Sequence, residues 1–168
     1  MGEQRNLNNK EGIDKLKELA MAADICMFAS HLNGIPISVR PMSTRDVDEE
    51  GNIWFFSRET SDKNDEIKAD NRVQLFYANN SSFEYLSVFG HAHIIKDAAM
   101  AKELWSTWTK AWFKDGPEDP ELTLIKIVPE NVFYWDTKNN KMVGLLKMVA
   151  SVITGTEVDD GVYGIINV

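Results

Sequence analysis

The spacing of hydrophobic and polar residues divides most of the chain into short amphipathic segments. Between residues 9 and 23 the apolar positions recur every three or four residues, which predicts a helix with one buried face. Later segments alternate apolar and polar residues or are short apolar runs bounded by turns, as strands are. We predict strands over residues 26–32, 35–42, 53–57, 73–78, 84–96, 122–128 and 131–136.

The first two predicted strands are expected to form a hairpin. Asn33-Gly34 lies between them and is a strong signal for a two-residue turn. Alternation along the second strand gives one set of residues that we expect to face the core: Ile35, Ile37 and Val39. Pro41 cannot donate a ladder hydrogen bond, so we expect this strand end at a sheet edge, with backbone left for a ligand.

Three more helices are predicted after the hairpin. Residues 61–70 have helical composition, with Ser61 as the N-cap. Residues 98–113 place Trp105, Trp108 and Trp112 on one stripe, which we expect to pack on the sheet or across a subunit interface. An amphipathic helix over 142–153 ends near Gly155, and residues 158–168 add a short strand.

The order of these elements predicts the fold class. Most strands follow one another through turns, so antiparallel pairing should dominate, with helices at the start, middle and end of the chain. This pattern favours an α+β fold built on a small closed or split antiparallel β-barrel over a doubly wound parallel sheet. At 168 residues, the chain is expected to form a single domain over residues 1–168.

Composition narrows the class of partner and the compartment. The net charge of −8 repels polyanions on average, so we do not expect nucleic acid as a partner. No run approaches the roughly 20 apolar residues of a membrane span, and the first ten residues lack the apolar core of a signal peptide. With a single cysteine, Cys26, no internal disulfide can form, and we expect a cytoplasmic protein without membrane contact.

A local cluster of cations stands out in this acidic chain. Arg40, Arg45 and Arg58 are three of its five arginines, and Lys63 and Lys68 follow closely. Arginine forks, a lysine charge, hydroxyls and a helix N-terminus are the groups that bind phosphate. Composition alone favours a plainer interpretation, in which the cations pair on the surface with the acidic residues of the intervening turn. These are Asp46, Asp48, Glu49 and Glu50.

Other candidate sites are weaker. The sequence has no P-loop, dinucleotide fingerprint, zinc-protease motif or nucleophile elbow. His91 and His93 share one face of a strand and could chelate a metal, but no third ligand is evident, so we assign no metal site. Cys26 lies in an apolar run without a neighbouring cation and is expected to be a buried core residue.

The sequence blocks around the cationic cluster resemble a known family. Arg40-Pro41-Met42-Ser43, the block from Trp54 to Lys63, and Asn71-Arg72-Val73 occur in the order found in the FMN-binding split-barrel superfamily of pyridoxamine 5'-phosphate oxidases. Within it, the chain resembles the general stress protein 26 group of small bacterial flavin proteins, from the first helix through Asp136. The resemblance implies a homodimer that binds one FMN in each of two clefts between its subunits.

The resemblance also implies which residues contact FMN. Arg40 would meet the phosphate or the ribityl chain, and the backbone of Pro41, Met42 and Ser43 would follow the isoalloxazine edge. Phe56 and Ser57 would close on the ribityl phosphate, and Ser61 and Lys63 would form the phosphate-binding turn. Tyr85 would reach the flavin across the dimer, and Trp135 would lie close to the ring.

Two departures from the oxidases change the expected function. Asp62 stands where the oxidases have an arginine, which we expect to lower phosphate affinity or to cap the following helix. Residues 138–168 contain no arginine, whereas the oxidases grip pyridoxal phosphate with an arginine-rich end, so we do not expect vitamin B6 oxidase activity.

The resemblance therefore implies a stress-related flavoprotein that acts as an FMN-dependent oxidoreductase. Reduced nicotinamide or a similar small-molecule donor would supply its electrons, and the flavin would perform the redox chemistry, so no catalytic side chain is assigned. The alternatives are a non-catalytic FMN carrier or sensor in the stress response and a flavin-free structural dimer. The residues do not distinguish FMN from FAD or a deazaflavin, and they do not identify the electron acceptor.

Overall fold

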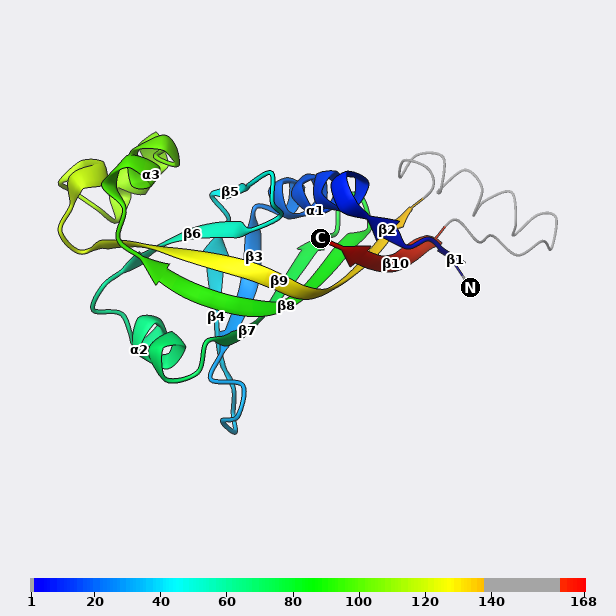
Figure 1. Ribbon diagram of the computed structural model, residues 1–168, viewed down its shortest axis with the longest axis horizontal. Coiled ribbons are helices and arrows are strands. Elements are labelled where there is room, and N and C mark those ends of the chain that lie inside the picture. The colour runs from blue at the N-terminus through cyan, green and yellow to red at the C-terminus, as the bar shows by residue number, and fades with distance from the viewer. Residues whose placement is uncertain (1, 138–160) are drawn as a thin grey trace.

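The computed structural model describes residues 2–137 and 161–168. In this part of the chain, ten strands form one curled sheet with one longer helix against its inner side, two short α-helices and two 3-10 turns (Figure 1). The strands are β1 (Glu3–Gln4), β2 (Leu7–Asn8), β3 (Ile25–Ser30), β4 (Ser38–Ser43), β5 (Asp46–Val47), β6 (Ile53–Arg58), β7 (Arg72–Asn79), β8 (Glu84–Ile95), β9 (Leu122–Thr137) and β10 (Gly161–Asn167). The helices are α1 (Asn9–Ala23), α2 (Asp62–Ala69) and α3 (Ala98–Glu103), with 3-10 turns η1 (Thr107–Ala111) and η2 (Gly116–Glu118).

The sheet is mainly antiparallel, as the sequence predicted. Its strands follow the order β1-β10-β9-β8-β7-β3-β4, while β6 pairs with β9 and β5 with β6. Strand β9 joins the two halves, because its first part pairs with β6 and its last part with β10. Parallel pairing occurs where β1 and β2 lie beside β10. The α+β class and the strand nature of residues 161–167 are confirmed.

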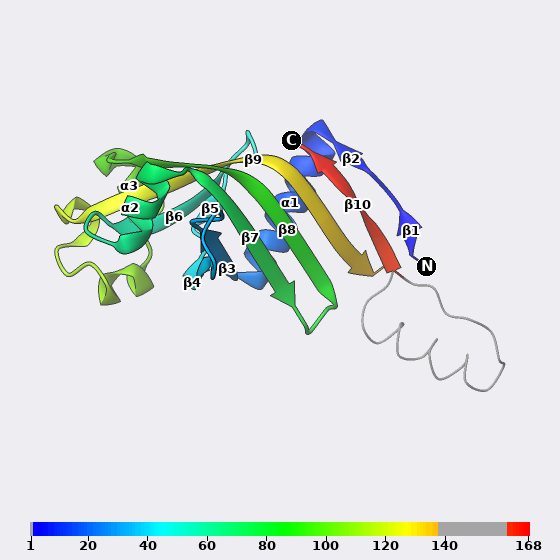
Figure 2. The ribbon, with the colours of Figure 1, turned by 90° about the horizontal axis from the view of Figure 1, so that it is seen from below.

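Helix α1 occupies the predicted residues and covers the inner side of the sheet, as Figure 2 shows. Its Leu16, Leu19 and Ala20 are buried among side chains from β3, β7, β8 and β9. Cys26 of β3 belongs to the same core, and burial raises the pKa of its thiol to about 12. A thiol with such a pKa stays protonated at neutral pH, which fits the predicted core role of this cysteine.

The hairpin of β3 and β4 forms, but two details of its prediction are wrong. The strands are joined by residues 31–37 and not by a two-residue turn at Asn33-Gly34. The residues expected in the core are exposed, with exposed fractions of 100% for Ile35, 44% for Ile37 and 42% for Val39. Both faces of β4 carry apolar residues, so alternation alone could not tell the inner face from the outer one.

The edge position predicted for Pro41 is confirmed. Strand β4 ends the main strand order and pairs with β3 alone among the described strands. Met42 packs against the core on the inner side, whereas Pro41 lies on the outer side opposite Met27. The free edge of β4 therefore borders the region that contains α2 and the cationic cluster.

The predicted strands over 122–128 and 131–136 are one strand, β9. Gly90 pairs with Pro129 and Phe89 with Asn131, so Glu130 has no partner residue across the ladder. This is a β-bulge, and it allows Pro129, which cannot donate a ladder hydrogen bond, to lie within a long strand. The proline broke the sequence pattern without ending the strand.

The predicted helix over residues 98–113 is wrong beyond its first turns. The Asp97 side chain accepts hydrogen bonds from the backbone of Ala99 and Met100 and begins α3, which ends at Glu103. The chain then forms η1, and the hydroxyls of its N-cap residue Ser106 and of Thr109 accept from the Arg45 guanidinium at 3.0 and 3.4 Å. These side-chain contacts compete with helix continuation. Trp105 is half-buried, while Trp108 and Trp112 are exposed by 82% and 62%.

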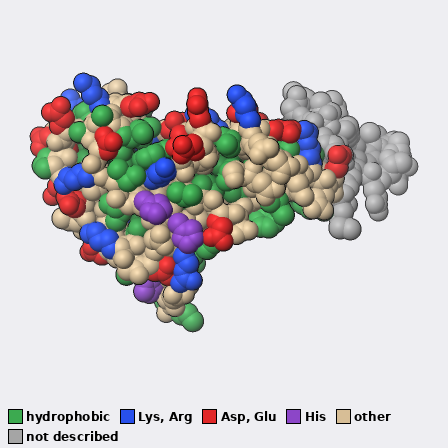
Figure 3. Space-filling view, viewed as in Figure 1, with side chains coloured by type: hydrophobic (Ala, Val, Ile, Leu, Met, Phe, Trp, Pro, Cys, Tyr) green, Lys and Arg blue, Asp and Glu red, His purple; other side chains and the backbone are tan. Residues whose placement is uncertain are grey.

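The surface carries both signs of charge. On the face shown in Figure 3, acidic and basic side chains are interspersed with patches of hydrophobic side chains. No helix in the described part of the chain is long and apolar enough to cross a membrane. The predicted helix over 142–153 falls outside the described residues.

Candidate functional site

A cavity of about 310 Å³ lies where β4, β6, the start of α2 and the segment around η1 meet. Seven of the ten residues predicted to bind a cofactor line it, and they come from two separate stretches of chain. The lining residues are Pro41, Met42, Ser43, Arg45, Phe56, Ser57, Arg58, Ser61, Lys63, Thr109, Trp112 and Phe113. Antiparallel folding therefore brings residues 41–45 and 56–63, the two sequence blocks that contain most of the cationic cluster, to one place.

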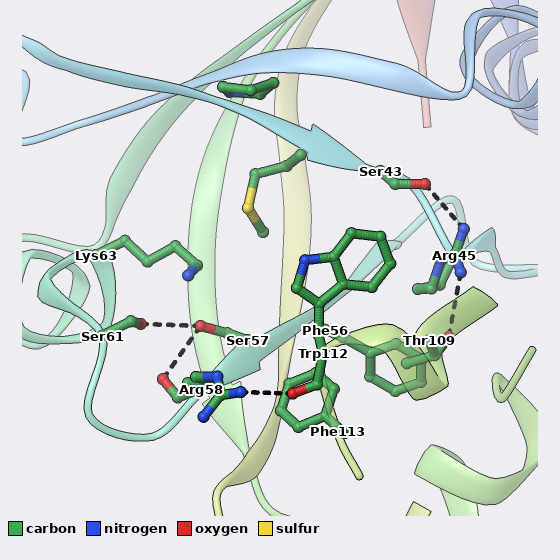
Figure 4. Close-up of a pocket in the computed structure, with 12 residues that line it drawn as sticks. Ser43, Arg45, Phe56, Ser57, Arg58, Ser61, Lys63, Thr109, Trp112 and Phe113 are labelled. Carbon is green, nitrogen blue, oxygen red and sulfur yellow. Dashed lines mark hydrogen bonds between the residues drawn. The ribbon is translucent and has the colours of Figure 1, made fainter. Parts of the chain in front are cut away.

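The cavity has polar side chains on two sides and aromatic rings between them (Figure 4). In Figure 4, Lys63, Ser61, Ser57 and Arg58 lie on one side, and Ser43, Arg45 and Thr109 lie on the other. The rings of Phe56, Trp112 and Phe113 lie between these groups. Such a site can hold a planar ring system that carries an anionic tail.

Lys63 is the cation best placed to bind an anion. It is half-buried on the first turn of α2, and its amine extends into the cavity (Figure 4). Among the described residues, none makes a hydrogen bond or ion pair with this amine. Burial and the nearby Arg40 charge lower the pKa of Lys63, and the charges of Asp62 and Glu66, which raise it, only partly offset them. An anionic ligand would supply further negative charge.

The hydroxyls beside Lys63 belong to a buried hydrogen-bond network. Ser57 donates to Asn64 Oδ1 at 2.7 Å, and Asn64 Nδ2 donates to Thr123 Oγ1 at 3.1 Å. The Thr123 hydroxyl in turn donates to the Ser57 carbonyl at 3.0 Å. Ser61 is the N-cap residue of α2, but its hydroxyl pairs with Ser57 at 3.0 Å and makes no capping bond. The network connects the hydroxyl of Ser57 on β6 with the start of α2, where Ser61 and Lys63 lie.

Arg40 lies beside the cavity and does not line it. Its guanidinium binds Ser30 and Glu66, with 2.9 Å between Nη2 and Glu66 Oε2. Burial alone would raise the pKa of Glu66, but hydrogen bonds from Ser30, Ser38 and Arg40 lower it overall. Arg40 therefore acts on the cavity through its charge near Lys63, and its direct contact with a ligand remains a prediction.

Tyr85 and Trp135 are brought together, but away from this cavity. They are direct partners across the β8–β9 ladder, with exposed fractions of 37% and 47%. Their pair lies toward the end of β9 that binds β10, whereas the cavity lies near the end that binds β6. Neither residue lines the cavity of its own chain, and their role at a ligand remains a prediction.

Five lining residues were not assigned to a site from the sequence. Arg45 binds Ser43 at 2.8 Å and the hydroxyls of Ser106 and Thr109 at the start of and within η1, so it attaches η1 to the end of β4. Arg58 donates to the Trp112 carbonyl at 2.5 Å, pairs with Glu121 at 2.7 Å and lies 5.6 Å from the Phe113 ring. Both arginines were part of the recognised cationic cluster. The sequence pattern around Thr109, Trp112 and Phe113 predicts a packing helix and gives no signal of a binding site.

The two histidines considered as metal ligands do not form a metal site with other described residues. His91 contacts Asn71 at 3.2 Å and Glu130 at 2.9 Å through its two ring nitrogens. Within residues 2–137 and 161–168, no three histidine, cysteine or acidic side chains are grouped as metal ligands would be.

Comparison with known proteins gives a family and a set of similar structures. A family model described as "Pyridoxamine 5'-phosphate oxidase like" matches residues 11–159. Protein bli-3 of Neurospora crassa is 27% identical over 111 residues, which is 61% of this chain and 53% of that protein. The chain therefore matches about half the length of this curated relative.

Solved structures share the fold over most of the chain. A protein of Jannaschia sp. CCS1 assigned as a general stress protein 26 has a TM-score of 0.76 at 22% identity, with 95% of this chain and 96% of that one covered. The general stress FMN/FAD binding protein of Xanthomonas citri has a TM-score of 0.64 at 22% identity, with 74% and 87% covered. The predicted split-barrel fold is confirmed by these likenesses.

Proposed function

Because the chain belongs to the pyridoxamine 5'-phosphate oxidase-like family, we propose that it is a flavoprotein that binds FMN in the cavity beside α2. The observation that carries the proposal is the Lys63 amine, which is half-buried, directed into the cavity and unpaired among the described residues. A similar structure is described as an FMN/FAD binding protein, which agrees with a flavin nucleotide as the ligand class.

The residues of the cavity fit this cofactor. Lys63 and the Ser61 hydroxyl offer a charge and a donor to a terminal phosphate, which favours FMN over riboflavin. Phe56, Trp112 and Phe113 offer apolar ring surfaces to the isoalloxazine, and the edge backbone of Pro41 to Ser43 is near enough to border it. When bound, FMN would supply the exchange of electrons or hydride.

We assign the protein's own contribution to binding and shielding. The twelve lining residues include no carboxylate, imidazole, thiol or phenol that could act as a general acid or base at neutral pH. The expected activity is therefore an oxidoreduction carried by the flavin, with reduced nicotinamide or a similar small molecule as donor. The half-exposed ring of Phe56 and the exposed ring of Trp112 would control how closely that donor approaches.

We further propose a homodimer formed through the outer face of the sheet. Pro41, Met27, Phe76, Ser87 and Phe133 are successive partners across β4, β3, β7, β8 and β9, so they point to the same side. Met27, Phe76 and Phe133 have exposed fractions of 46%, 48% and 43%. Connected apolar patches of this kind are typical of protein interfaces.

The same face offers a reason for the position of Tyr85 and Trp135. Their paired rings continue the apolar surface at the far end of β8 and β9. Across a twofold axis, residues remote from the cavity of one chain can reach the cavity of its partner. We therefore retain both as flavin contacts supplied in trans.

Cofactor identification is the first test. The purified protein is expected to be yellow, and mass spectrometry of the heat-released cofactor should give FMN. Stripped protein should bind FMN more tightly than riboflavin in a fluorescence titration. A colourless protein that binds neither flavin would refute the proposal.

Anaerobic mixing with reduced nicotinamide tests the redox function. Bleaching of the flavin absorbance within seconds would support an oxidoreductase. Stable bound FMN with no bleaching by NADH or NADPH would instead favour a carrier or sensor.

A further inference from the structure

Helix α2 is attached to the rest of the protein by few buried side chains. Of its eight residues, only Asn64 and Ile67 are buried. Ile67 lies in the main hydrophobic core, while Asn64 is fully buried on the first turn, next to Lys63. The first turn is therefore held by a polar contact, and the helix body is held by an apolar one.

The Asn64 side chain connects three structural elements. It accepts from Ser57 of β6 at 2.7 Å and donates to Thr123 of β9 at 3.1 Å. Ser57 and Thr123 are direct partners in the β6–β9 ladder. A carboxamide of this length that satisfies both hydroxyls fixes the distance and rotation of the first turn of α2 against the sheet.

The direction of the donors in this network also decides which hydroxyl is available to a ligand. Because the Ser57 proton is used by Asn64, the 3.0 Å contact between Ser57 and Ser61 needs a proton from Ser61. Ser61 is the first donor in this chain of hydrogen bonds, and it lines the cavity. It can turn its proton to an anion, and Ser57 then keeps its own bond to Asn64, so no buried donor is left unsatisfied.

We propose that Asn64 is the positioning residue of the phosphate end of the cavity. Through Ser57 and the first turn of α2, it places the Ser61 hydroxyl and the Lys63 amine so that both reach the same terminal oxyanion of the flavin nucleotide. This inference rests on the proposed FMN binding and adds a residue that does not itself touch the ligand.

The test compares the affinities for FMN and riboflavin, which differ only by the phosphate. Asn64→Asp keeps the size and the acceptor for Ser57 but loses the donor to Thr123 and adds a buried negative charge. Thr123→Val keeps the shape but removes the hydroxyl, and Thr123→Ser restores it. Ile67→Val is the matched control, because it weakens the attachment of the same helix without touching the network.

Flavin fluorescence titrations and thermal unfolding should be measured for each variant. We expect Asn64→Asp to lower FMN affinity by about tenfold or more, the loss of one charged hydrogen bond, and riboflavin affinity by less than about threefold. Thr123→Val should act in the same direction and Thr123→Ser should retain the wild-type ratio of the two affinities. Ile67→Val should lower the unfolding temperature and keep that ratio.

The outcomes separate this inference from the proposed function. If the wild-type protein prefers FMN but Asn64→Asp and Thr123→Val lose both ligands equally, or keep the wild-type ratio, Asn64 is not a positioning residue for the phosphate. The same conclusion follows if Ile67→Val changes the ratio as strongly. If the wild-type protein binds neither flavin, the proposed function itself is refuted. Should Asn64→Asp not fold, the two Thr123 variants still decide the matter.

Discussion

Replacing Lys63 by methionine should remove most of the protein's preference for a phosphorylated flavin. Methionine keeps the apolar stem and removes only the ammonium. In the ligand-free protein this ammonium is already half-buried and has no hydrogen-bonding partner among the described residues, so a phosphate breaks no existing pair when it binds. The full value of a charged hydrogen bond, about 1.5 to 3 kcal/mol, should therefore appear in the affinity.

That free energy corresponds to roughly a ten- to a hundredfold loss of FMN affinity. Riboflavin, which lacks the phosphate, should bind to Lys63→Met almost as it binds to the wild type. Trp112→Ala is the matched comparison, because it removes an apolar wall and should weaken both ligands alike. Equal losses of FMN and riboflavin in Lys63→Met would refute the assignment of Lys63 to the phosphate.

The same substitution should change the pH dependence of the ligand-free protein. Burial and the charge of Arg40 lower the pKa of Lys63 in the folded state, so the unfolded chain holds this proton more tightly than the folded one. Stability then rises with pH between the lowered pKa and the ordinary lysine value of about 10.4. Urea unfolding at several alkaline pH values should show this rise in the wild type and a smaller one in Lys63→Met. A difference between the two proteins that does not change with pH would contradict it.

Two further predictions concern the interface and the acidic turn. Phe76→Asp, at the centre of the outer sheet face, should convert the dimer to a monomer in sedimentation experiments. Met21→Asp, on the exposed side of α1, should leave the dimer intact. If both variants remain dimers, the outer sheet face is not the interface. Asp48→Ala should lower the free energy of unfolding in urea by about 1–3 kcal/mol, since the buried Trp54 donates to Asp48 at 2.8 Å. Burial alone would raise the pKa of Asp48, but hydrogen bonds from Asn52 and Trp54 lower it overall. The contribution of Asp48 to the free energy of unfolding is therefore present above about pH 4 and is lost as the pH falls through the lowered pKa. A variant with wild-type stability at neutral pH, or a contribution that grows in acid, would contradict this account.

The sequence predicted elements best where one face is apolar and the other polar. The α1, β7 and β8 patterns have a single buried face, and each lies within a residue or two of its predicted position. Strand β4 has apolar residues on both sides, and the side that carries Val39 proved to be exposed. If the proposed dimer is correct, a second chain covers that side. Both sides of β4 are then apolar environments, one in the core and one at the interface, and the pattern along a single chain does not say which is which.

The errors in β9 and in residues 98–113 have a different cause, because long-range contacts overrode local signals there. A bulge accommodates Pro129 within β9, and Arg45 holds the hydroxyls of Ser106 and Thr109 where a continued helix would have been expected. Gly90, which pairs with Pro129, and Arg45 both lie far in the sequence from the residues they contact. For the same reason, the cavity wall formed by Trp112 could not be foreseen, although the neighbouring blocks around Pro41 and Lys63 could.

The cationic cluster shows why counting charges is a poor guide to a binding site. Arg40 is neutralised by Glu66, Arg58 is paired with Glu121, and Arg45 has its donors occupied by hydroxyls and a carbonyl. Each of these cations would have to break existing bonds before it could bind a ligand, whereas Lys63 would not.

The acidic residue that departs from the oxidase pattern can be understood in the same terms. Asp62 lies on the first turn of α2, where a negative side chain interacts favourably with the helix dipole. It therefore stabilises the helix that presents Lys63. In the proposed site, phosphate binding would depend on the Lys63 amine rather than on the number of cations nearby. On this reasoning, Asp62→Asn should leave the preference for FMN over riboflavin in place, while Lys63→Met removes it.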